Sequence, residues 1–302
     1  MISLVKLAFL ILAHRSPEQV IKLVNSLIYE KDVTIFIHVD AKANGVFEVL
    51  KNEFRNNPGV VFTPFRYKVY WGSYNQIRAT VLLIKTAVQF GKFDYYSLIS
   101  GQDMPVKPLA EFKEFLSQNC GKEFMIHFKL PDSGNWGECG GLDRLQLFWV
   151  DIKIQRYSYS FRKLNKFIHK LQGALRYKRK LKYEFYGGFN WFTLSKEAVS
   201  YIVNFLDKNK AYLKRYRYTG CADEIFIQTI LMNSPLKENM VNESLRYIDW
   251  ASGPEYPKIM RMEDFNTLTG SNRVYFARKF DYSVDQKVID ELITFVTKRE
   301  TV

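Results

Sequence analysis

Short apolar runs recur through the first hundred residues of the chain. Leu7 to Ala13 is an unbroken apolar run, and Val33 to Val39 is a second, mostly apolar run that is followed by Asp40. Shorter runs follow at Val60 to Thr63 and at Tyr95 to Ser100. Continuous apolar runs of this length are typical of strands that a parallel sheet buries on both faces. The pattern therefore predicts four buried strands.

Helical patterns separate these runs. One begins at Ser16-Pro17, where a capping residue precedes a first-turn proline, and another begins at Ser73. Alternating strands and helices predict an α/β fold with an open, mostly parallel, Rossmann-like sheet flanked by helices. Such sheets bind ligands at the carboxyl ends of their strands, so we expect His14, Asp40 and Asp103 on one rim.

The second part of the chain is less regular. It contains a Gly-rich loop at 132–141, a strand at 187–194 followed by a helix that Ser195 caps, a strand at 245–250 and a closing helix at 284–296. No repeat or flexible linker interrupts the chain. We predict one catalytic domain over 1–302, with a nucleotide-binding half (1–120) and an acceptor and catalytic half (121–302).

Positive charge is concentrated in one segment. The formal net charge is +13, and residues 152–183 carry eleven Lys or Arg and no Asp or Glu, so the rest of the chain carries only +2. A local excess, without an RRM, KH or zinc-knuckle motif, argues against a nucleic-acid binder. A solvated helical face explains the segment most simply. Because aromatic residues lie among the charges, contact with an anionic membrane is the alternative.

Cysteine and histidine give no sign of a metal centre. The three cysteines have no C-x-x-C spacing and the four histidines are scattered, which argues against zinc and for a reducing compartment. The apolar run at the N-terminus is too short to span a bilayer, and no other segment is long enough. We expect a cytoplasmic protein, soluble or peripheral on the inner membrane.

Two late motifs carry candidate chemistry. Cys221-Ala222-Asp223-Glu224 places carboxylates at a predicted helix start, with Glu224 the better candidate base and Asp223 suited to capping. Phe276 to Asp281 places Arg278 and Lys279 beside aromatic residues. The chain lacks G-x-G-x-x-G, the P-loop motif and Asp-x-Asp. A base with a cationic clamp suits sugar transfer from a diphosphate leaving group without a metal.

An ordered set of motifs resembles a known family. The motifs are Leu12-Ala13-His14, Ile37 to Asp40, Val69-Tyr70-Trp71-Gly72, Tyr95 through Pro105, Gly188 through Phe192, Ala222-Asp223-Glu224 and Phe276 to Asp281. Together they resemble the core-2/I-branching enzyme and peptide O-xylosyltransferase family over about residues 6–295. The resemblance implies a GT-A fold and inverting transfer from a UDP-sugar, with no metal and no other cofactor.

The resemblance also implies roles for single residues. Glu224 matches the catalytic base. The donor-binding positions are Asp40, Tyr70 and Trp71 for the nucleotide, Asn190 and Trp191 near the donor sugar, and Ser252, Arg278 and Lys279 for the phosphates. A second phosphate-binding arginine of the branching enzymes has no clear match, and both Lys258 and Arg261 lie nearby.

Some departures from the family bear on specificity. The xylosyltransferases carry Asp where this chain has Asn190, and we expect neither the cysteine framework nor the membrane anchor of secretory-pathway members. We therefore expect a bacterial-type member that transfers N-acetylglucosamine to a hydroxyl of a glycan or lipid-linked glycan. The alternatives are a xylosyltransferase and a non-catalytic sugar- or membrane-binding module on the same fold.

Overall fold

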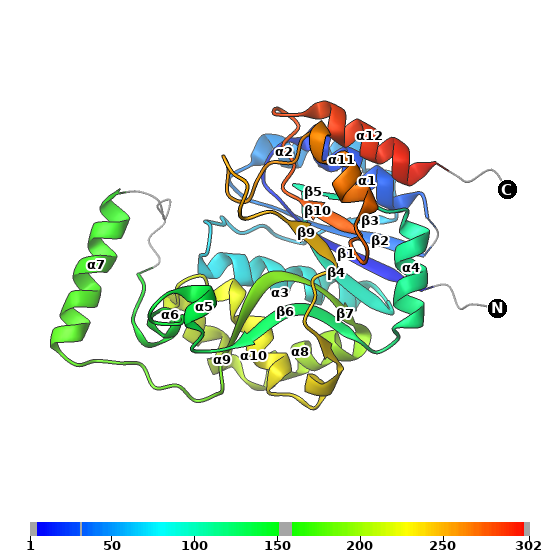
Figure 1. Ribbon diagram of the computed structural model, residues 1–302. Helices are drawn as coiled ribbons and strands as arrows, with labels where there is room; N and C mark the ends of the chain where they lie inside the picture. Colours follow the sequence, from blue (N-terminus) through cyan, green and yellow to red (C-terminus); the bar gives the residue numbers. More distant parts are fainter. Residues whose placement is uncertain (1–4, 31, 151–158, 299–302) are drawn as a thin grey trace.

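The computed structural model describes residues 5–30, 32–150 and 159–298. Within these residues a seven-stranded sheet has the order β3-β2-β1-β4-β7-β6-β8 (Figure 1). Its strands are β1 (Leu7–Ala13), β2 (Val33–Val39), β3 (Val60–Phe62), β4 (Tyr95–Ser100), β6 (Glu123–Lys129), β7 (Tyr186–Ser195) and β8 (Met240–Val241). The first four in the order run parallel, and β7 runs antiparallel to both β4 and β6. The predicted α/β fold with a mostly parallel sheet is confirmed.

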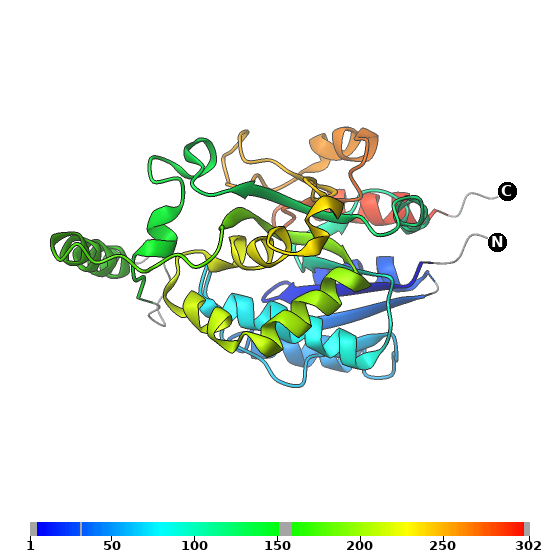
Figure 2. The ribbon, with the colours of Figure 1, turned by 90° about the horizontal axis from the view of Figure 1, so that it is seen from below.

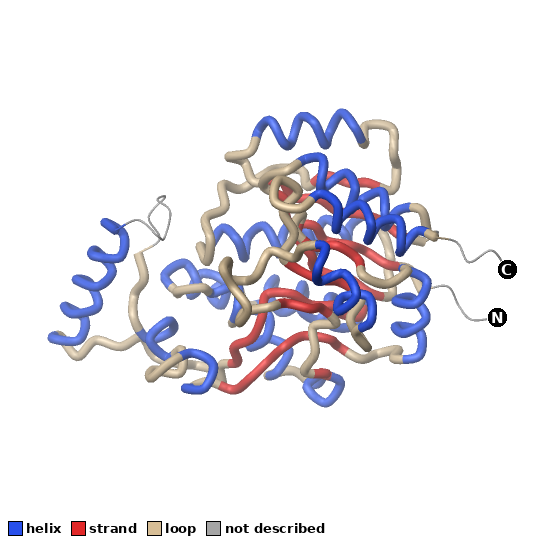
Figure 3. Tube along the Cα trace, turned by 45° about the horizontal axis from the view of Figure 1, so that its top comes forward, coloured by secondary structure: helices blue, strands red, loops and turns tan. Residues whose placement is uncertain are grey.

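Helices cover both faces of this sheet. They are α1 (Pro17–Ile28), α2 (Asn44–Glu53), α3 (Tyr74–Phe90), α4 (Leu109–Gln118), α8 (Lys196–Lys208), α9 (Lys210–Arg215), α10 (Phe226–Met232), α11 (Phe265–Gly270) and α12 (Gln286–Thr297). In Figure 3 the strands lie between the two helical layers.

The alternation of side chains along β1 explains the two layers, because successive residues of a strand point to opposite faces. Leu7, Phe9 and Ile11 pack into one core with α1, α4 and α12, and Ala8 and Leu10 pack into a second core with α3, α8 and α10. All five side chains are fully buried. This burial on both faces is the reason that the run Leu7–Ala13 has no polar residue.

A smaller sheet adjoins the carboxyl ends of β1 and β4. It has the order β5-β10-β9, formed by β5 (Asp103–Pro105), β10 (Phe276–Arg278) and β9 (Arg246–Ile248). β10 pairs antiparallel with β5, which sets Arg278 opposite Asp103, and parallel with β9. The strand predicted at 245–250 is thus a three-residue strand. This sheet brings a late segment to the rim where the early strands end.

The basic segment contains a helix that stands away from the rest of the protein. α7 (Tyr159–Ala174) projects to one side in both Figure 1 and Figure 2. Residues 151–158 lie outside the described residues, so only the part of the basic segment from residue 159 is placed. None of the helices that the structure describes is long and apolar enough to cross a bilayer.

Two short elements precede α7. α5 (Ser133–Trp136) and α6 (Leu142–Gln146) occupy the Gly-rich segment 132–141 and the residues after it. Gly141 has a φ of 82°, and a Cβ there would lie 2.2 Å from the Trp136 ring. Glycine is therefore required at this position, and it lets Trp136 pack against the start of α6.

The caps agree only in part with the sequence. Ser195 accepts a hydrogen bond from the backbone N–H of Ala198, as predicted. Ser16 does not cap α1 through its side chain, since its φ is 50° and it is in the left-handed region. The closing helix begins at Gln286 and is capped by Asp285, which accepts a bond from the N–H of Val288.

Candidate active site

The rim at the carboxyl ends of β1 and β2 holds the predicted nucleotide residue Asp40. Its backbone N–H donates to the carbonyl of Ala13, which joins the two strand ends. Its carboxylate accepts a bond from the N–H of Lys42 at 2.8 Å and pairs with the Lys42 ammonium at 3.3 Å. That ammonium lies 4.0 Å from the centre of the Tyr70 ring. Asp40 and Tyr70 are thus brought together, through a lysine that the sequence analysis missed.

His14 connects this group to the phosphate-binding candidate Lys279. Burial lowers the pKa of His14, the positive charges of Arg15, Lys279 and Lys42 lower it further, and Asp40 raises it. The imidazole is therefore neutral at pH 7 and lies in a positive environment. The expectation that His14 and Asp40 share one rim is confirmed, and Lys279 lies at the same rim.

Lys279 differs from the other two cations at this rim, Arg15 and Lys42, because it forms no ion pair with a carboxylate of the described residues. Its ammonium has no hydrogen-bond or ion-pair partner among the described residues. Burial lowers the pKa of Lys279, and the charges of Arg15 and Arg278 lower it further. Arg15, by contrast, pairs with Asp281 at 2.8 Å. A partly buried ammonium among other cations is well placed to accept an anion.

Arg278 has a different environment from its neighbour. Its guanidinium lies 4.2 Å from the centre of the Trp191 ring and 3.5 Å from the carboxylate of Asp103. Arg246 pairs with the same carboxylate at 3.5 Å and also faces Trp191, at 5.6 Å. The Arg278 side chain is only 14% exposed. It is turned inward, toward Asp103 and Trp191.

Asp103 has two structural roles at the end of β4. Its carboxylate accepts bonds from the backbone N–H and the hydroxyl of Ser100, which closes the local turn. The side chain is fully buried, and its charge is balanced by Arg246 and Arg278. It thereby fixes the cations that support Trp191.

Asn190 and Trp191 lie side by side on β7. Asn190 is buried, and its Nδ2 has no hydrogen-bond partner within the described structure. A buried amide without a partner costs free energy unless a ligand or water satisfies it. Asn190 therefore supplies a buried polar donor, and the next residue of β7, Trp191, supplies a ring on which Arg278 stacks.

Glu224 lies on a different segment, at the end of a 3-10 turn. This turn, η2 (Ala222–Glu224), follows Cys221, whose φ of 44° is left-handed. Oε2 of Glu224 lies 2.8 Å from Nη1 of Arg144, and the Glu224 side chain is 30% exposed. The Arg144 guanidinium in turn stacks on Trp136 at 3.9 Å. The candidate base is thus accessible and oriented by an arginine that the sequence analysis did not single out.

Asp223 does not have its predicted capping role. α10 begins at Phe226 with Ile225 at the cap position, and no side chain caps it. Asp223 is buried within the 3-10 turn. The predicted helix start is two residues too early, because the two acidic residues form a separate turn.

The remaining candidates are spread over two loops. Trp71 is 56% exposed, and Ser252 is exposed, with its backbone N–H bonded to Asp249. Lys258 pairs with Asp264 at 2.6 Å, and Arg261 pairs with Glu255 at 3.0 Å. Both candidates for a second phosphate-binding cation are therefore engaged by carboxylates. The cations that act on Lys279 are instead Arg15 and Arg278.

The comparison with protein families decides the classification. The sequence model of the Core-2/I-Branching enzyme family matches residues 7–269. The chain belongs to the Core-2/I-branching enzyme family. Its α/β sheet agrees with the GT-A fold that the family resemblance implies.

Curated relatives within this family are xylosyltransferases. Xylosyltransferase 2 of Rattus norvegicus is 26% identical over 96% of this chain and 33% of its own length. Xylosyltransferase 1 of Homo sapiens is 25% identical over 95% of this chain and 30% of its own length. The chain thus spans about a third of the length of these relatives.

Among solved structures, the PaToxG glycosyltransferase is 9% identical, with a TM-score of 0.32 over 97% of this chain and 86% of that chain. A likeness this low carries no argument about fold or function.

Proposed function

We propose that this protein is a glycosyltransferase and moves a sugar from a UDP-sugar to an acceptor hydroxyl with inversion at the anomeric carbon. The observation that carries the proposal is the Lys279 ammonium, unpaired among the described residues and grouped with Arg15, His14 and Asp40 at the strand-end rim. A diphosphate is the anion that this position suits, because open sheets bind nucleotides at this rim. Asp40 and Tyr70 would then contact the nucleoside.

In the proposed reaction Glu224 accepts the proton of the acceptor hydroxyl. The acceptor oxygen attacks the anomeric carbon from the face opposite to UDP. The bond between that carbon and the diphosphate oxygen breaks, and its electron pair leaves with UDP. Lys279 stabilises the negative charge that develops on the diphosphate, and Arg144 keeps the Glu224 carboxylate in place.

We propose that no metal or other cofactor takes part. Within the described residues no three His, Cys, Asp or Glu side chains are grouped as a metal site would require. What supports the proposal is Lys279, whose ammonium has no carboxylate partner among the described residues and can supply fixed charge where a divalent cation would otherwise act.

The preferred donor is UDP-N-acetylglucosamine, with UDP-xylose as the alternative. Asn190 stands where the xylosyltransferases carry Asp, and its buried Nδ2 can donate to a donor-sugar oxygen, a bond that an aspartate could not donate. The xylosyltransferase relatives favour the alternative. A direct comparison of the two donors therefore decides between them.

We further propose that α7 rests on an anionic membrane, on the cytoplasmic side, and presents a lipid-linked glycan to the site. Its inner face contacts the segment 148–150: the N–H of Val150 donates to Asn165, and His169 packs on Trp149 at 4.5 Å. The outer face carries an exposed apolar stripe, namely Leu164, Phe167 and Leu171, followed by Leu175.

The charges on α7 favour a lipid surface as its partner. Lys163, Lys166 and Lys170 lie next to the stripe on the same helix, at a spacing of three to four residues. Phe167 and Leu175 are 64% and 69% exposed, which is unusual for large apolar side chains in water. An apolar stripe with flanking cations on a projecting helix is the arrangement of an interfacial helix on anionic lipid.

A donor screen tests the enzymatic proposal. A ligand that binds only the native state raises the unfolding temperature by mass action. UDP, UDP-N-acetylglucosamine and UDP-xylose should each stabilise the protein in EDTA, and the true donor should also be slowly hydrolysed to free sugar. Stabilisation by UDP without turnover of any donor would favour the non-catalytic sugar-binding module, and no response to UDP would refute a UDP-sugar enzyme.

A further inference from the structure

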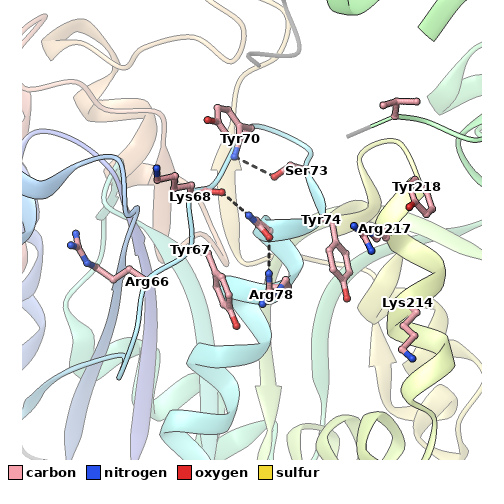
Figure 4. Close-up of a pocket in the computed structure, with 12 residues that line it drawn as sticks. Arg66, Tyr67, Lys68, Tyr70, Ser73, Tyr74, Arg78, Lys214, Arg217 and Tyr218 are labelled. Atoms are coloured by element: carbon pink, nitrogen blue, oxygen red, sulfur yellow. Dashed lines mark hydrogen bonds between the residues drawn. The ribbon is translucent and has the colours of Figure 1, made fainter. Parts of the chain in front are cut away.

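A polar hollow lies beside the rim that holds Asp40 and Tyr70. It has a volume of about 990 Å³, and all of its lining residues except Val150 come from two separate segments (Figure 4). One wall is the loop before α3 with the first turns of that helix, and the other is the end of α9 with the turn that follows it. The volume is at the upper end of that of small-molecule sites and suffices for several sugar rings.

The charge of the lining is all of one sign. Among the twelve lining residues are five cations and no carboxylate: Arg66, Lys68, Arg78, Lys214 and Arg217. In the described structure none of the five forms an ion pair with Asp or Glu. Arg66 and Arg78 bond only to the amide oxygens of Asn44 and Asn75. Cations gathered without counter-charges raise the local concentration of anions.

The two walls converge on Tyr74. Burial raises the pKa of its hydroxyl, while the charges of Arg78 and Arg217, one from each wall, act in the opposite direction. Both guanidiniums therefore lie near one tyrosine hydroxyl. Figure 4 shows Arg78 and Arg217 on either side of Tyr74.

Tyrosines supply the rest of the surface. Tyr67, Tyr70, Tyr74 and Tyr218 line the hollow, and Arg78 stacks on Tyr67 at 4.0 Å. A tyrosine ring offers a flat apolar face together with a polar hydroxyl, which suits a sugar ring with its apolar C–H face and hydroxyl edge. The lining thus combines surfaces for sugar rings with charges for acids.

The hollow lies between the donor side and the base side of the active site. Tyr70 lines it and also lies under the Lys42 ammonium that pairs with Asp40. On the other wall Gly220 lies two residues after Tyr218, and its N–H donates to the carbonyl of Arg144, the partner of Glu224. A molecule in this hollow is held where an acceptor must approach.

We propose that this hollow binds the acceptor, and that the acceptor is an anionic glycan whose charge is a ring carboxylate or a phosphate ester. The role of the bound glycan as acceptor rests on the proposed function. The binding of an acidic saccharide in this hollow does not depend on that function. The cations contact the acid groups, and Tyr67, Tyr74 and Tyr218 contact the sugar rings, whereas Tyr70 forms the border with the donor side.

The test compares acidic and neutral probes by calorimetry. Tetragalacturonate and a farnesyl-diphosphate-linked N-acetylglucosamine represent the two sources of charge, and galactotetraose is the neutral match. At least one acidic probe should bind more than tenfold tighter than galactotetraose, with an affinity that falls as salt rises. Whichever acidic probe binds identifies the source of the charge. Equal affinity for acidic and neutral probes would overturn the proposal.

Paired variants locate the binding site. Lys214→Gln with Arg217→Gln removes two exposed cations of the hollow and should weaken binding of the acidic probe at least tenfold. Lys208→Gln with Lys210→Gln removes two exposed cations outside it, and binding should stay within twofold. An equal loss in both double variants would mean non-specific attraction and would reject the site.

Stabilisation by UDP separates this inference from the enzymatic proposal. UDP should stabilise the Lys214→Gln, Arg217→Gln protein as it does the wild type, and saturating UDP should leave the affinity for the acidic probe intact. Competition between UDP and the acidic probe would assign the hollow to the donor and overturn the acceptor site. If the protein binds the acidic probe and UDP does not stabilise it, the acidic-saccharide site stands and only the UDP-sugar enzyme is refuted.

Discussion

Arg144 holds the carboxylate of Glu224, with Nη1 2.8 Å from Oε2, and stacks its own guanidinium on Trp136. The two residues are 80 positions apart in the chain. An arginine fixed on an aromatic ring orients a carboxylate with little loss of freedom on binding, because the guanidinium is already held. The Glu224 carboxylate is therefore accessible to solvent and held in one direction by Arg144.

The first prediction concerns this pair. Glu224→Gln should lower turnover by roughly 10²–10⁴-fold, the usual range for a lost general base. The affinity for UDP should not change, because Glu224 is proposed to act on the acceptor. Steady-state rates and UDP calorimetry on the purified variant measure both. Turnover close to that of the wild type would remove Glu224 from the role.

Arg144 serves as the control for the mechanism. If Arg144 is a positioning residue, Arg144→Gln should lower kcat, and Arg144→Lys should restore part of the lost kcat. In the Glu224→Gln background the Arg144→Gln change should have no further effect, because the group that it positions is already gone. Additive losses in the double variant would show that Arg144 acts elsewhere.

The second prediction concerns Lys279. Lys279→Ala should weaken UDP binding by roughly 10- to 100-fold, which corresponds to about 1.5–3 kcal/mol for a charge-assisted bond. Its stability without ligand should not fall, because the change relieves repulsion from Arg15 and Arg278. Lys258→Ala is the matched control, since that ammonium is held by Asp264. An equal effect of both variants on UDP affinity would contradict the assignment.

The third prediction concerns metal ions. With the diphosphate neutralised by fixed cations, transfer should proceed at full rate in excess EDTA, and added Mn²⁺ or Mg²⁺ should not raise it. Initial rates with and without chelator measure this directly. Loss of activity in EDTA with recovery in Mn²⁺ would refute the metal-independent mechanism.

What the sequence predicted well was local. The runs Leu7–Ala13, Val33–Val39 and Tyr95–Ser100 are strands with those bounds, since burial on both faces leaves a mostly apolar signal. The cap at Ser195 was likewise readable, because a cap depends on neighbouring residues. α2 was missed for the opposite reason: Leu50 is its only fully buried residue, so its apolar pattern is weak.

The partners of the site residues could not be predicted. Arg15 meets Asp281 across 266 positions, and Glu224 meets Arg144 across 80. No periodicity or spacing connects such segments, because only the folded sheet brings them together. The sequence therefore indicated one residue of such a pair, for example Glu224, but not the arginine that binds it.

The fourth prediction concerns pH and two buried groups with opposite effects. Burial raises the pKa of Glu123 to about 7 from its ordinary 4.5, and burial lowers the pKa of His38 to about 4 from 6.5. Folded Glu123 keeps a proton that the unfolded chain loses, so its contribution to stability is lost as pH rises from 4.5 through 7. His38 is neutral when folded, so its contribution is lost as pH falls from 6.5 through 4.

Glu123→Gln isolates the first effect. The amide can accept the N–H of Ser195 as the carboxyl does, and it cannot ionise. The free energy of unfolding of the variant, minus that of the wild type, should therefore rise by about 3 kcal/mol between pH 4.5 and 7. Urea titrations at several pH values measure the difference. A constant difference across this range would show that Glu123 does not titrate there.

The fifth prediction concerns α7 and the membrane. An exposed apolar stripe beside a row of lysines should bind anionic vesicles reversibly, since each cation near the surface contributes about 1 kcal/mol at best and several act together. Arg179 must be left intact in the test, because its guanidinium bonds to the carbonyl of Tyr218 and the hydroxyl of Thr219 and so holds the fold.

Charge reversal at four exposed lysines of this segment is the decisive variant: Lys166, Lys170, Lys178 and Lys180 to Glu. It should release the protein from phosphatidylserine vesicles in a flotation assay and leave transfer to a soluble acceptor intact. Reversal of four exposed lysines elsewhere, at 122, 208, 210 and 287, removes the same charge and should not release it. Binding should also weaken with salt, because exposed charges are screened, and Phe167→Asp should weaken it where salt is low. Equal binding to neutral and anionic vesicles would contradict the proposal that α7 rests on an anionic membrane, because charge complementarity is the reason for that proposal.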